Sequence, residues 1–439
     1  MIRLATATEN IASTVDAAVA DLGRMIAIDT SFPPGCGYPR FAELMEELLA
    51  PLGFACERVT VPRELWQDAA GFADGERINL LARRRTGRPV LGLYFHVDTV
   101  PPATGWQRDP FRLVEVDGRL TGLGAADMKG CVAAVLLALR AAKAFDVPLA
   151  YDPMLLLCTD EEGGLYPGVR YLAEQGKLEG HVANFNGSAE PRIWAGCFGM
   201  FNLAITVKGA TVHAGEGSTV GARRDAIDGA LPLLWQLQAL KASVATRMSA
   251  LPPHPDAKEP LAASLTISSL HGGTAGGQVP AALSILINRR YPSEERFADA
   301  LAEIDALVAA ARHDHPALSF ETALVGHLVP TADPAGPHWQ RWQRALATGF
   351  GYPVEAFRRW GAASCSDFGY VQRATGRSEV LLGGLGRPDR NIHGPGEYTT
   401  RQDIISLATA VLSYLAADFA PELVPASRLL VEGATHVAS

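Results

Sequence analysis

The apolar positions of the chain follow two different spacings, and their alternation predicts the secondary structure. Three segments, 80–85, 90–96 and 154–159, are predicted to be strands, and the last two are strongly apolar and therefore central. Apolar residues recur every three to four positions over 9–28, which predicts a helix there, and further helices are predicted over 41–52 and 131–144. Strands that alternate with helices favour a mostly parallel sheet covered by helices on both faces.

The pattern changes near Met200 and changes back near Pro330. The middle part predicts a compact α+β unit, with strands over 201–207, 261–270, 283–291 and 318–325 and helices over 223–242 and 294–312. Helix–strand alternation then returns, with a helix over 339–350, a strand over 378–382 and a helix over 401–418. We predict an α/β fold with a discontinuous main domain, residues 1–199 and 328–439, and an inserted α+β domain, residues 200–327.

Composition narrows the class of protein. The 439 residues, 48% apolar and 20% charged, are typical of a globular protein of two domains. A net charge of −8 argues against nucleic acid and anionic membranes as partners. Residues 1–21 have no apolar core, which predicts no signal peptide, and the apolar run 131–139 is too short to span a bilayer. Six scattered cysteines without a C-x-x-C pair favour a cytoplasmic protein with reduced thiols.

Candidate metal ligands stand at the ends of the predicted strands. His96 ends the strand over 90–96, and Asp98 lies two residues on, so both are predicted to face the same side. The Asp98 carboxylate is expected to accept a hydrogen bond from the second ring nitrogen of His96, which fixes the tautomer of a metal-binding histidine. Further chemistry-bearing residues follow the other apolar or glycine-rich segments: Asp127, Glu161, Glu162, Glu190 and His393. Histidine and carboxylates at several strand ends indicate a zinc-type hydrolytic site.

These residues lie in motifs that resemble one known family. The motifs, in chain order, are His96-Val97-Asp98, Trp106 with Asp109-Pro110-Phe111, Gly124 to Gly130, Thr159 to Gly163, Ala189-Glu190-Pro191 and His393 to Glu397. In this order and across most of the chain, they resemble the two-metal aminoacylase and carboxypeptidase family, which includes acetylornithine deacetylase, succinyl-diaminopimelate desuccinylase and glutamate carboxypeptidase. The resemblance implies that the main domain is catalytic and that the inserted domain is a lid that commonly carries dimer contacts.

The resemblance also implies a ligand set for two divalent ions, most often zinc, with manganese or cobalt as substitutes. His96 and Glu190 would bind one ion, Glu162 and His393 the other, and Asp127 both. The residue types agree, because two ions about 3.5–4 Å apart need a bridging anion, and imidazole with carboxylate suits zinc. Members of the family also hold the peptide after the bridging aspartate in cis, so we expect a cis bond between Asp127 and Met128.

Glu161 and Glu162 are expected to have different roles, because adjacent side chains cannot point the same way. A metal ion lowers the pKa of a bound water to about 7, and a nearby carboxylate can carry its proton to the leaving amine. The resemblance assigns this general-base role to Glu161 and the ligand role to Glu162.

Three residues of the lid complete the candidate site by resemblance. His213 matches a family histidine that donates to the developing oxyanion, and Arg290 matches an arginine that grips a substrate carboxylate, with Arg289 facing the other way. Gly277 lies where the family approaches the substrate backbone. In dimeric relatives the equivalent of His213 reaches the partner's metals, so we expect a homodimer joined through the lid, by the strand over 201–207 or the helix over 223–242.

Three departures from the family pattern concern the substrate more than the metals. Leu123 stands where the family often has arginine, the usual asparagine near Gly277 is missing, and Gly396 replaces a polar residue. Glycines at 272, 273, 276 and 277 indicate a loop that closes on the substrate.

The sequence therefore predicts a metal-dependent amidohydrolase that cleaves an N-acyl amino acid or a related amide bearing a carboxylate. A carboxypeptidase or dipeptidase with the same chemistry remains an alternative, because both need a carboxylate clamp. A hydrolase of an unusual C–N bond, such as an aryl amine or a carbamoyl group, is a further alternative. A non-catalytic binding protein on the same fold would be favoured by the loss of Glu161 or of a ligand, and all are present.

Overall fold

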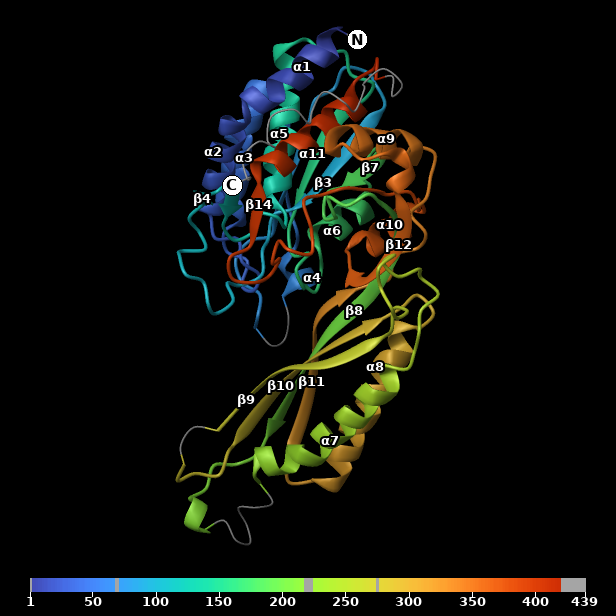
Figure 1. Cartoon of the computed structure of the whole chain (residues 1–439). Coiled ribbons are helices and arrows are strands. Elements are labelled where there is room, and N and C mark those ends of the chain that lie inside the picture. The colour runs from blue at the N-terminus through green and yellow to red at the C-terminus, as the bar shows by residue number, and fades with distance from the viewer. Residues whose placement is uncertain (1, 68–70, 217–223, 274–275, 420–439) are drawn as a thin grey trace, which may run out of the picture.

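The chain forms two lobes, one above the other in Figure 1. The computed structural model describes residues 2–67, 71–216, 224–273 and 276–419. The upper lobe contains the first and the last described segments of the chain, and their apolar side chains share one hydrophobic core that runs from Leu4 to Phe419. The lower lobe, formed by the middle of the chain, has a separate core, from Phe201 to Phe320. The predicted discontinuous α/β domain with an inserted α+β domain is confirmed.

A six-stranded sheet forms the centre of the upper lobe. In spatial order it consists of β1 (Ala55–Thr60), β2 (Ile78–Arg83), β6 (Asp152–Cys158), β3 (Val90–His96), β7 (His181–Asn184) and β13 (Leu381–Leu382). The strands from β6 to β13 are parallel, and β2 pairs antiparallel with both β1 and β6. Every side chain of β6 is buried, as expected of a strand that lies in the middle of a sheet covered on both faces.

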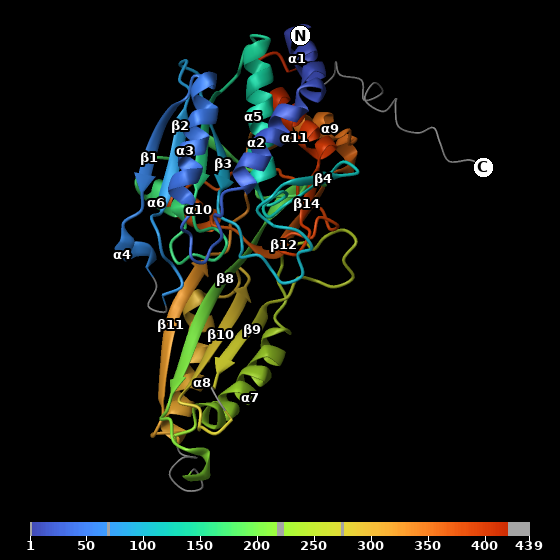
Figure 2. The ribbon, with the colours of Figure 1, turned by 90° about the vertical axis from the view of Figure 1, so that its left-hand side faces the viewer.

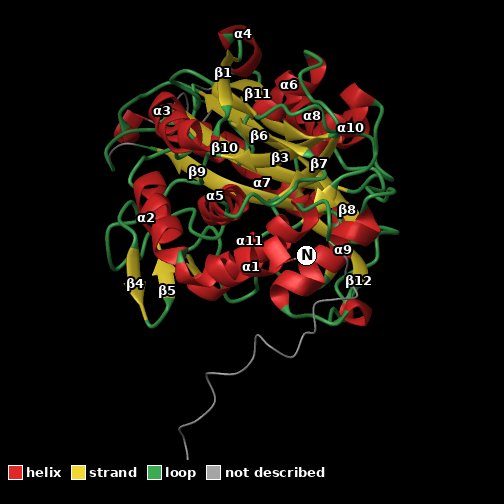
Figure 3. Cartoon of the chain, turned by 90° about the horizontal axis from the view of Figure 1, so that it is seen from above, coloured by secondary structure: helices red, strands yellow, loops and turns green. Residues whose placement is uncertain are grey.

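Helices cover both faces of this sheet (Figure 3). One face carries a packed group formed by α1 (Ile2–Ser13), α2 (Val15–Ile26), α5 (Lys129–Ala144), α9 (Trp339–Phe350) and α11 (Arg401–Leu415). The other face carries α6 (Gly168–Glu174) and α10 (Phe368–Thr375). Helix α3 (Tyr38–Leu49) packs near β2. Because α5 lies between the sheet and α11, it is apolar nearly all round rather than amphipathic.

The predicted helix over 9–28 is two helices, and several short elements have no sequence signal. The first helix ends at Ser13 and the second begins at Val15, with Thr14 between them. These short elements are α4 (Arg63–Trp66), η2 (Ala214–Glu216), η4 (Val354–Ala356) and the three-stranded sheet of β4 (Val114–Val116), β5 (Arg119–Thr121) and β14 (Tyr398–Thr400). The predicted helix over 41–52 ends as a 3₁₀ turn, η1 (Ala50–Leu52). In the described part of the chain, no helix has both the length and the apolar character needed to cross a bilayer.

The lower lobe is an antiparallel sheet with two helices packed on one face (Figure 2). Its strands, in spatial order, are β11 (Ser319–Leu328), β8 (Arg192–Lys208), β10 (Ala282–Tyr291) and β9 (Ser264–Gly272), and its helices are α7 (Ala226–Val244) and α8 (Phe297–Asp314). The predicted helix over 223–242 therefore begins later, and Arg223 lies outside the described residues. The strand over 201–207, one of the two predicted dimer contacts, is not an edge strand that could pair with a second copy, because β8 pairs with β10 on one side and β11 on the other.

Strand β8 belongs to both lobes. Its first residues pair parallel with β12 (Arg358–Cys365), and its later residues pair with the lid strands β10 and β11. The predicted boundary between residues 199 and 200 falls within this strand. The boundaries 1–199, 200–327 and 328–439 stay a prediction.

Candidate metal centre

His96 is the last residue of β3, at the carboxyl edge of the parallel strands. Its side chain is buried, and its Nε2 atom lies 3.0 Å from Oδ1 of Asp127. The Nδ1 atom lies 3.0 Å from the main-chain carbonyl oxygen of Asp98, so an Nδ1–H donates there and leaves Nε2 to face Asp127. This is the tautomer expected of a metal-binding histidine.

The Asp98 carboxylate has a different partner from the one predicted. Its Oδ1 atom lies 3.8 Å from Nδ1 of His96, beyond hydrogen-bond distance, whereas Oδ2 accepts a hydrogen bond of 2.8 Å from the main-chain N–H of Glu162. Burial raises the pKa of Asp98 to about 7. The tautomer of His96 is thus fixed by the backbone of Asp98, and the side chain of Asp98 holds Glu162.

Asp127 lies between the two predicted ligand histidines. Its Oδ1 atom is 3.0 Å from His96 Nε2, and its Oδ2 atom is 3.4 Å from His393 Nε2. The peptide bond between Asp127 and Met128 is cis, as the resemblance implied. One carboxylate therefore reaches an imidazole on each side, which is the position predicted for a bridging ligand.

His393 and Glu162 form the other side of this group. The Nε2 atom of His393 lies 3.0 Å from Oε1 of Glu162. Burial lowers the pKa of His393, but hydrogen bonds with Asp127 and Glu162 outweigh this effect and raise that pKa to about 11. The ligand atoms of His96, Asp127 and Glu162 all lie within 4.8 Å of one another. The mixture of imidazole and carboxylate atoms at this spacing fits a divalent cation such as zinc.

Glu161 is a buried carboxyl group beside these ligands. Only 6% of the residue is exposed, and burial raises the pKa of its carboxyl group well above the ordinary value, with His96 opposing and Asp367 reinforcing the shift. Across the described residues, no hydrogen-bond donor contacts this carboxylate, in contrast to those of Asp98 and Glu162. An unengaged carboxylate beside ligand atoms is suited to proton transfer.

Glu190 is not part of the group formed by His96, Asp127 and Glu162. Its Oε2 atom accepts a hydrogen bond of 2.8 Å from Ser188 Oγ, and its Oε1 atom lies 3.6 Å from His254 Nε2. His254 accepts a hydrogen bond at Nδ1 from the main-chain N–H of Asp256, so a neutral ring carries its proton on Nε2, toward Glu190. The segment that carries His254 leaves the lid after α7 and contacts β12, where Pro252 accepts a hydrogen bond from Gly361.

His213 and Gly277 lie together at the far end of the lid, away from this group. Strand β8 runs from the upper lobe to the tip of the lower lobe (Figure 1), and His213 follows its end at Lys208. His213 is exposed, and the backbones around it and Gly277 are joined by the hydrogen bond from Ala214 N–H to Gly277 O. The structure brings these two predicted residues to each other and does not bring them to the ligands of the same chain.

Arg290 lies at the opposite end of the lid, where it joins the upper lobe. Its Nη1 atom donates to the main-chain oxygen of Ala363 at 3.0 Å and lies 3.8 Å from Cys365 Sγ, both on β12. Arg289 points to the other face of β10, as expected, where it is fully buried and paired with Glu295. The guanidinium of Arg290 is therefore on the side of the sheet that faces β12.

Three residues near the site were not given a role from the sequence: His254, Asp367 and Glu397. Asp367 is buried and accepts a hydrogen bond from the Tyr94 hydroxyl, and burial raises its pKa to about 6. Glu397 is buried against the loop that carries Asp127. Glu397 had a signal, because it lies four residues after His393 in the same motif. His254 and Asp367 had none, because they approach the site only through the pairing of β12 and the path of the lid.

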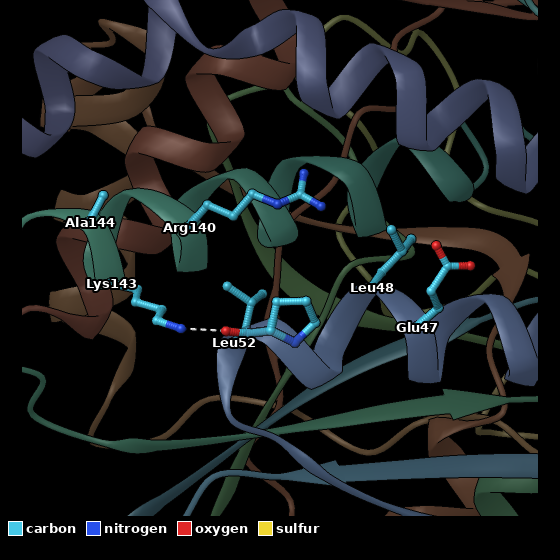
Figure 4. Close-up of a pocket in the computed structure, with 7 residues that line it drawn as sticks. Glu47, Leu48, Leu52, Arg140, Lys143 and Ala144 are labelled. Atoms are coloured by element: carbon cyan, nitrogen blue, oxygen red, sulfur yellow. Dashed lines mark hydrogen bonds between the residues drawn. The ribbon is translucent and has the colours of Figure 1, made fainter.

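A cavity beside α5 lies away from the candidate metal centre. A cavity of about 500 Å³ lies between α3 and the end of α5 (Figure 4), lined by Glu47, Leu48, Pro51, Leu52, Arg140, Lys143 and Ala144. Arg140 is eleven residues along α5 from Lys129, or about 17 Å at 1.5 Å per residue. The lining has one carboxylate and no histidine, so this cavity does not supply a metal site.

Imidazole and carboxylate ligands gathered at the carboxyl edge of a mostly parallel sheet define the class of metal-dependent hydrolases. Comparison with known proteins identifies the family. Residues 92–418 match the family described as Peptidase family M20/M25/M40, and because this match spans more than half of the chain, the chain belongs to that family. It is thereby a hydrolase of amide or peptide bonds.

Curated relatives and solved structures agree with this assignment. The chain is 31% identical over 296 residues to a succinyl-diaminopimelate desuccinylase of Delftia acidovorans (64% of this chain, 69% of the relative). It is 35% identical over 257 residues to the enzyme of the same name from Acidiphilium cryptum (55% and 64%). The matches therefore span about two thirds of the length of these relatives.

Solved structures show the same fold over nearly the whole chain. Human carnosine dipeptidase 1 superposes with a TM-score of 0.77 at 19% identity, covering 94% of this chain and 98% of that one. The dipeptidase Dug1p of Saccharomyces cerevisiae gives a TM-score of 0.80 at 17% identity, covering 94% and 97%.

Proposed function

We propose that the protein removes the acyl group from an N-acyl amino acid, or from a related amide that bears a carboxylate. The observation that carries this proposal is the unengaged, buried carboxylate of Glu161 beside the ligand group of His96, Asp127 and Glu162. Similarity to desuccinylases supports an acyl amide as the substrate, because succinyl-diaminopimelate is an amide of this kind. A dipeptidase or carboxypeptidase activity uses the same groups and is the alternative.

The proposal includes two divalent ions, most often zinc, with manganese or cobalt as substitutes, and the group of His96, Asp127 and Glu162 supports it. We assign His96 and Glu190 to one ion, Glu162 and His393 to the other, and Asp127 to both. To bind an ion, Glu190 would have to turn away from Ser188 and His254, which its carboxylate oxygens now face. The ions supply Lewis acidity, which polarises a carbonyl group and makes water a better nucleophile at neutral pH.

Side chains of the protein transfer the proton, bind the substrate and stabilise the oxyanion. Glu161 takes the proton of the attacking water and gives it to the leaving amine. Arg290 holds the carboxylate of the substrate through its guanidinium, and Asp98 keeps Glu162 in place. His213 donates a hydrogen bond to the developing oxyanion, and the backbone at Gly277 lies beside the substrate.

His213 and Gly277 can act only if the lid tip reaches a second active site, so the proposal includes a homodimer joined through the lid. Helix α7 supports it, because Trp235 and Leu231, four residues apart on one face, are 75% and 44% exposed. Strand β9 is the lid edge beside this helix. We further propose a cytoplasmic enzyme with a small-molecule substrate and without nucleic-acid or membrane partners.

The test is a substrate panel run on protein whose metal content is measured. N-acetyl, N-succinyl and N-formyl amino acids are compared with dipeptides before and after chelation, and after zinc, manganese or cobalt is added back. We expect activity on the acyl amino acids that chelation abolishes and metal restores. A preference for dipeptides would establish the alternative, and full activity of protein shown to be metal-free would disprove the proposal.

A further inference from the structure

The loop that carries Asp127 is held by a carboxylate that comes from a distant part of the sequence. Glu397 Oε1 accepts hydrogen bonds from the main-chain N–H groups of Ala126 at 2.9 Å and Asp127 at 3.0 Å. Its Oε2 atom accepts a third, of 3.1 Å, from Gly124 N–H. One side chain thus engages three of the four amides that end at Asp127.

The small three-stranded sheet brings Glu397 to this loop. Strand β14 pairs antiparallel with β5, so that Tyr398 lies opposite Thr121. The ladder continues by one bond, from Gly122 N–H to the main-chain oxygen of Glu397, at 3.1 Å. Because His393 lies four residues before Glu397, this register fixes the loop of His393 against the loop of Asp127.

The loop is shaped to accept this carboxylate. Gly124 has a φ of +75°, and a Cβ atom there would lie 2.8 Å from Thr99 Cγ2, so only glycine fits. Glu397 itself is 1% exposed. A buried carboxylate is costly unless its oxygen atoms accept hydrogen bonds, and three N–H donors satisfy it. A glutamine would present an N–H₂ group to at least one of these donors, so it cannot reproduce the arrangement.

We propose that Glu397 is a positioning residue for the metal centre. By holding the three amides, it fixes the direction of the Asp127 carboxylate between His96 and His393, and it thereby sets the affinity for the bridged ions. This inference rests on the proposed metal-dependent function. It concerns the binding of metal, so it can fail while that function stands.

The test measures zinc affinity of the full chain by competition with a chelating dye. Glu397→Gln is expected to weaken zinc binding by about 10- to 100-fold, the usual cost of losing a group that holds a metal ligand. Glu397→Asp keeps the charge but shortens the side chain, and we expect a smaller loss. This second variant also decides the outcome if the glutamine variant does not fold.

The matched control is Asp152, a buried carboxylate that also accepts hydrogen bonds from three main-chain amides. Its Oδ2 atom accepts hydrogen bonds from Thr86, Gly87 and Arg88 N–H at 2.6, 2.9 and 3.1 Å. Asp152 begins β6, about 20 Å from the end of that strand at Cys158 and hence from the metal centre. Asp152→Asn should lower the thermal midpoint of the metal-free protein, as Glu397→Gln does, yet leave zinc affinity unchanged.

The outcomes separate the two ideas. Wild-type zinc affinity in a folded Glu397 variant would overturn the positioning role while leaving the metal centre intact. Equal losses of affinity in the Glu397 and Asp152 variants would also overturn it, because they would show an effect of stability alone. Absence of zinc binding by the wild-type protein would instead disprove the proposed function and this inference with it.

Discussion

The edge of the six-stranded sheet and the tip of the lid each carry a predicted functional histidine, one buried and the other exposed to solvent. At the sheet edge, His96 and Glu161 are 1% and 6% exposed, and Asp98 and Glu397 bind the backbones that carry the ligands. At the lid tip, His213 is exposed, and its ring accepts a hydrogen bond from Gly215 N–H, two residues on. One histidine is fixed by its surroundings, whereas the other is presented outward.

This difference suits the separate roles proposed for the sheet edge and for the lid tip. Groups that must bind metal or transfer a proton need a fixed geometry, and a buried sheet edge supplies it. The proposed oxyanion donor, His213, stands instead on an exposed segment at the lid tip. The predictions below test this division, from the largest expected effect to the smallest.

At the buried sheet edge, Glu161 should make the largest single contribution to the catalytic rate. Glu161→Gln removes the proton carrier while keeping the size of the side chain, so kcat should fall by about 10²- to 10⁴-fold with the metal content unchanged. Steady-state kinetics and elemental analysis of the same sample measure both quantities.

The neighbouring residue is the control for this prediction. Glu162→Gln should lower the metal content, because Glu162 Oε1 lies 3.0 Å from His393 Nε2 and belongs to the predicted ligand group. If Glu161→Gln loses metal and Glu162→Gln keeps it, the two roles must be exchanged.

At the exposed lid tip, His213 should act on the active site of a second copy of the chain. His213→Ala should lower kcat by about 10²- to 10³-fold, as the loss of one oxyanion donor does. Mixed with Glu161→Gln protein under conditions of subunit exchange, it should regain up to about a quarter of wild-type activity, because half of the dimers are mixed and each has one complete site.

His313→Ala is the matched lid control, because His313 is exposed in the last turn of α8. This variant should keep wild-type kcat. Demonstrated exchange without recovered activity would mean that His213 does not serve a partner's site.

The smallest effect concerns the surface that would join the copies. Trp235→Glu on α7 should weaken the dimer by about 30-fold or more, since a buried tryptophan at an interface contributes about 2 kcal/mol. Sedimentation velocity over a dilution series measures this change. Val116→Glu, at a 50% exposed position on β4 of the other lobe, is the control and should leave the dimer intact. Equal behaviour of the two variants would place the interface elsewhere.

Apolar patterning predicted those elements whose surroundings are uniform. Val90–His96 and Trp339–Phe350 have the predicted bounds, because a buried strand and an amphipathic helix each impose one regular spacing. Strand β8 was predicted only over 201–207, although it begins at Arg192. Its first half lies between the two lobes, where the side chains are buried on both faces, so no alternation marks it.

The sequence predicted which candidate ligand residues come together, but it did not predict all of the hydrogen bonds among them. His96, Asp127, Glu162 and His393 carry their own chemistry and come together in the structure. The partner of the Asp98 carboxylate was predicted wrongly, because it depends on where the backbone of Glu162 passes. A contact between residues 64 positions apart is set by sheet register, which a local motif does not contain.

Strand β8 has a mechanical consequence. It is a continuous strand of 17 residues. Its first residues pair with β12 in the upper lobe, and its later residues belong to the lid sheet. From Gly196, where φ is +113°, to Lys208 the strand extends about 40 Å at 3.3 Å per residue. A rotation of about 5° at the base therefore sweeps the tip through about 3–4 Å, roughly the length of a hydrogen bond. A small change of backbone angle at the base of β8 would thus become a large displacement of the segment that carries His213.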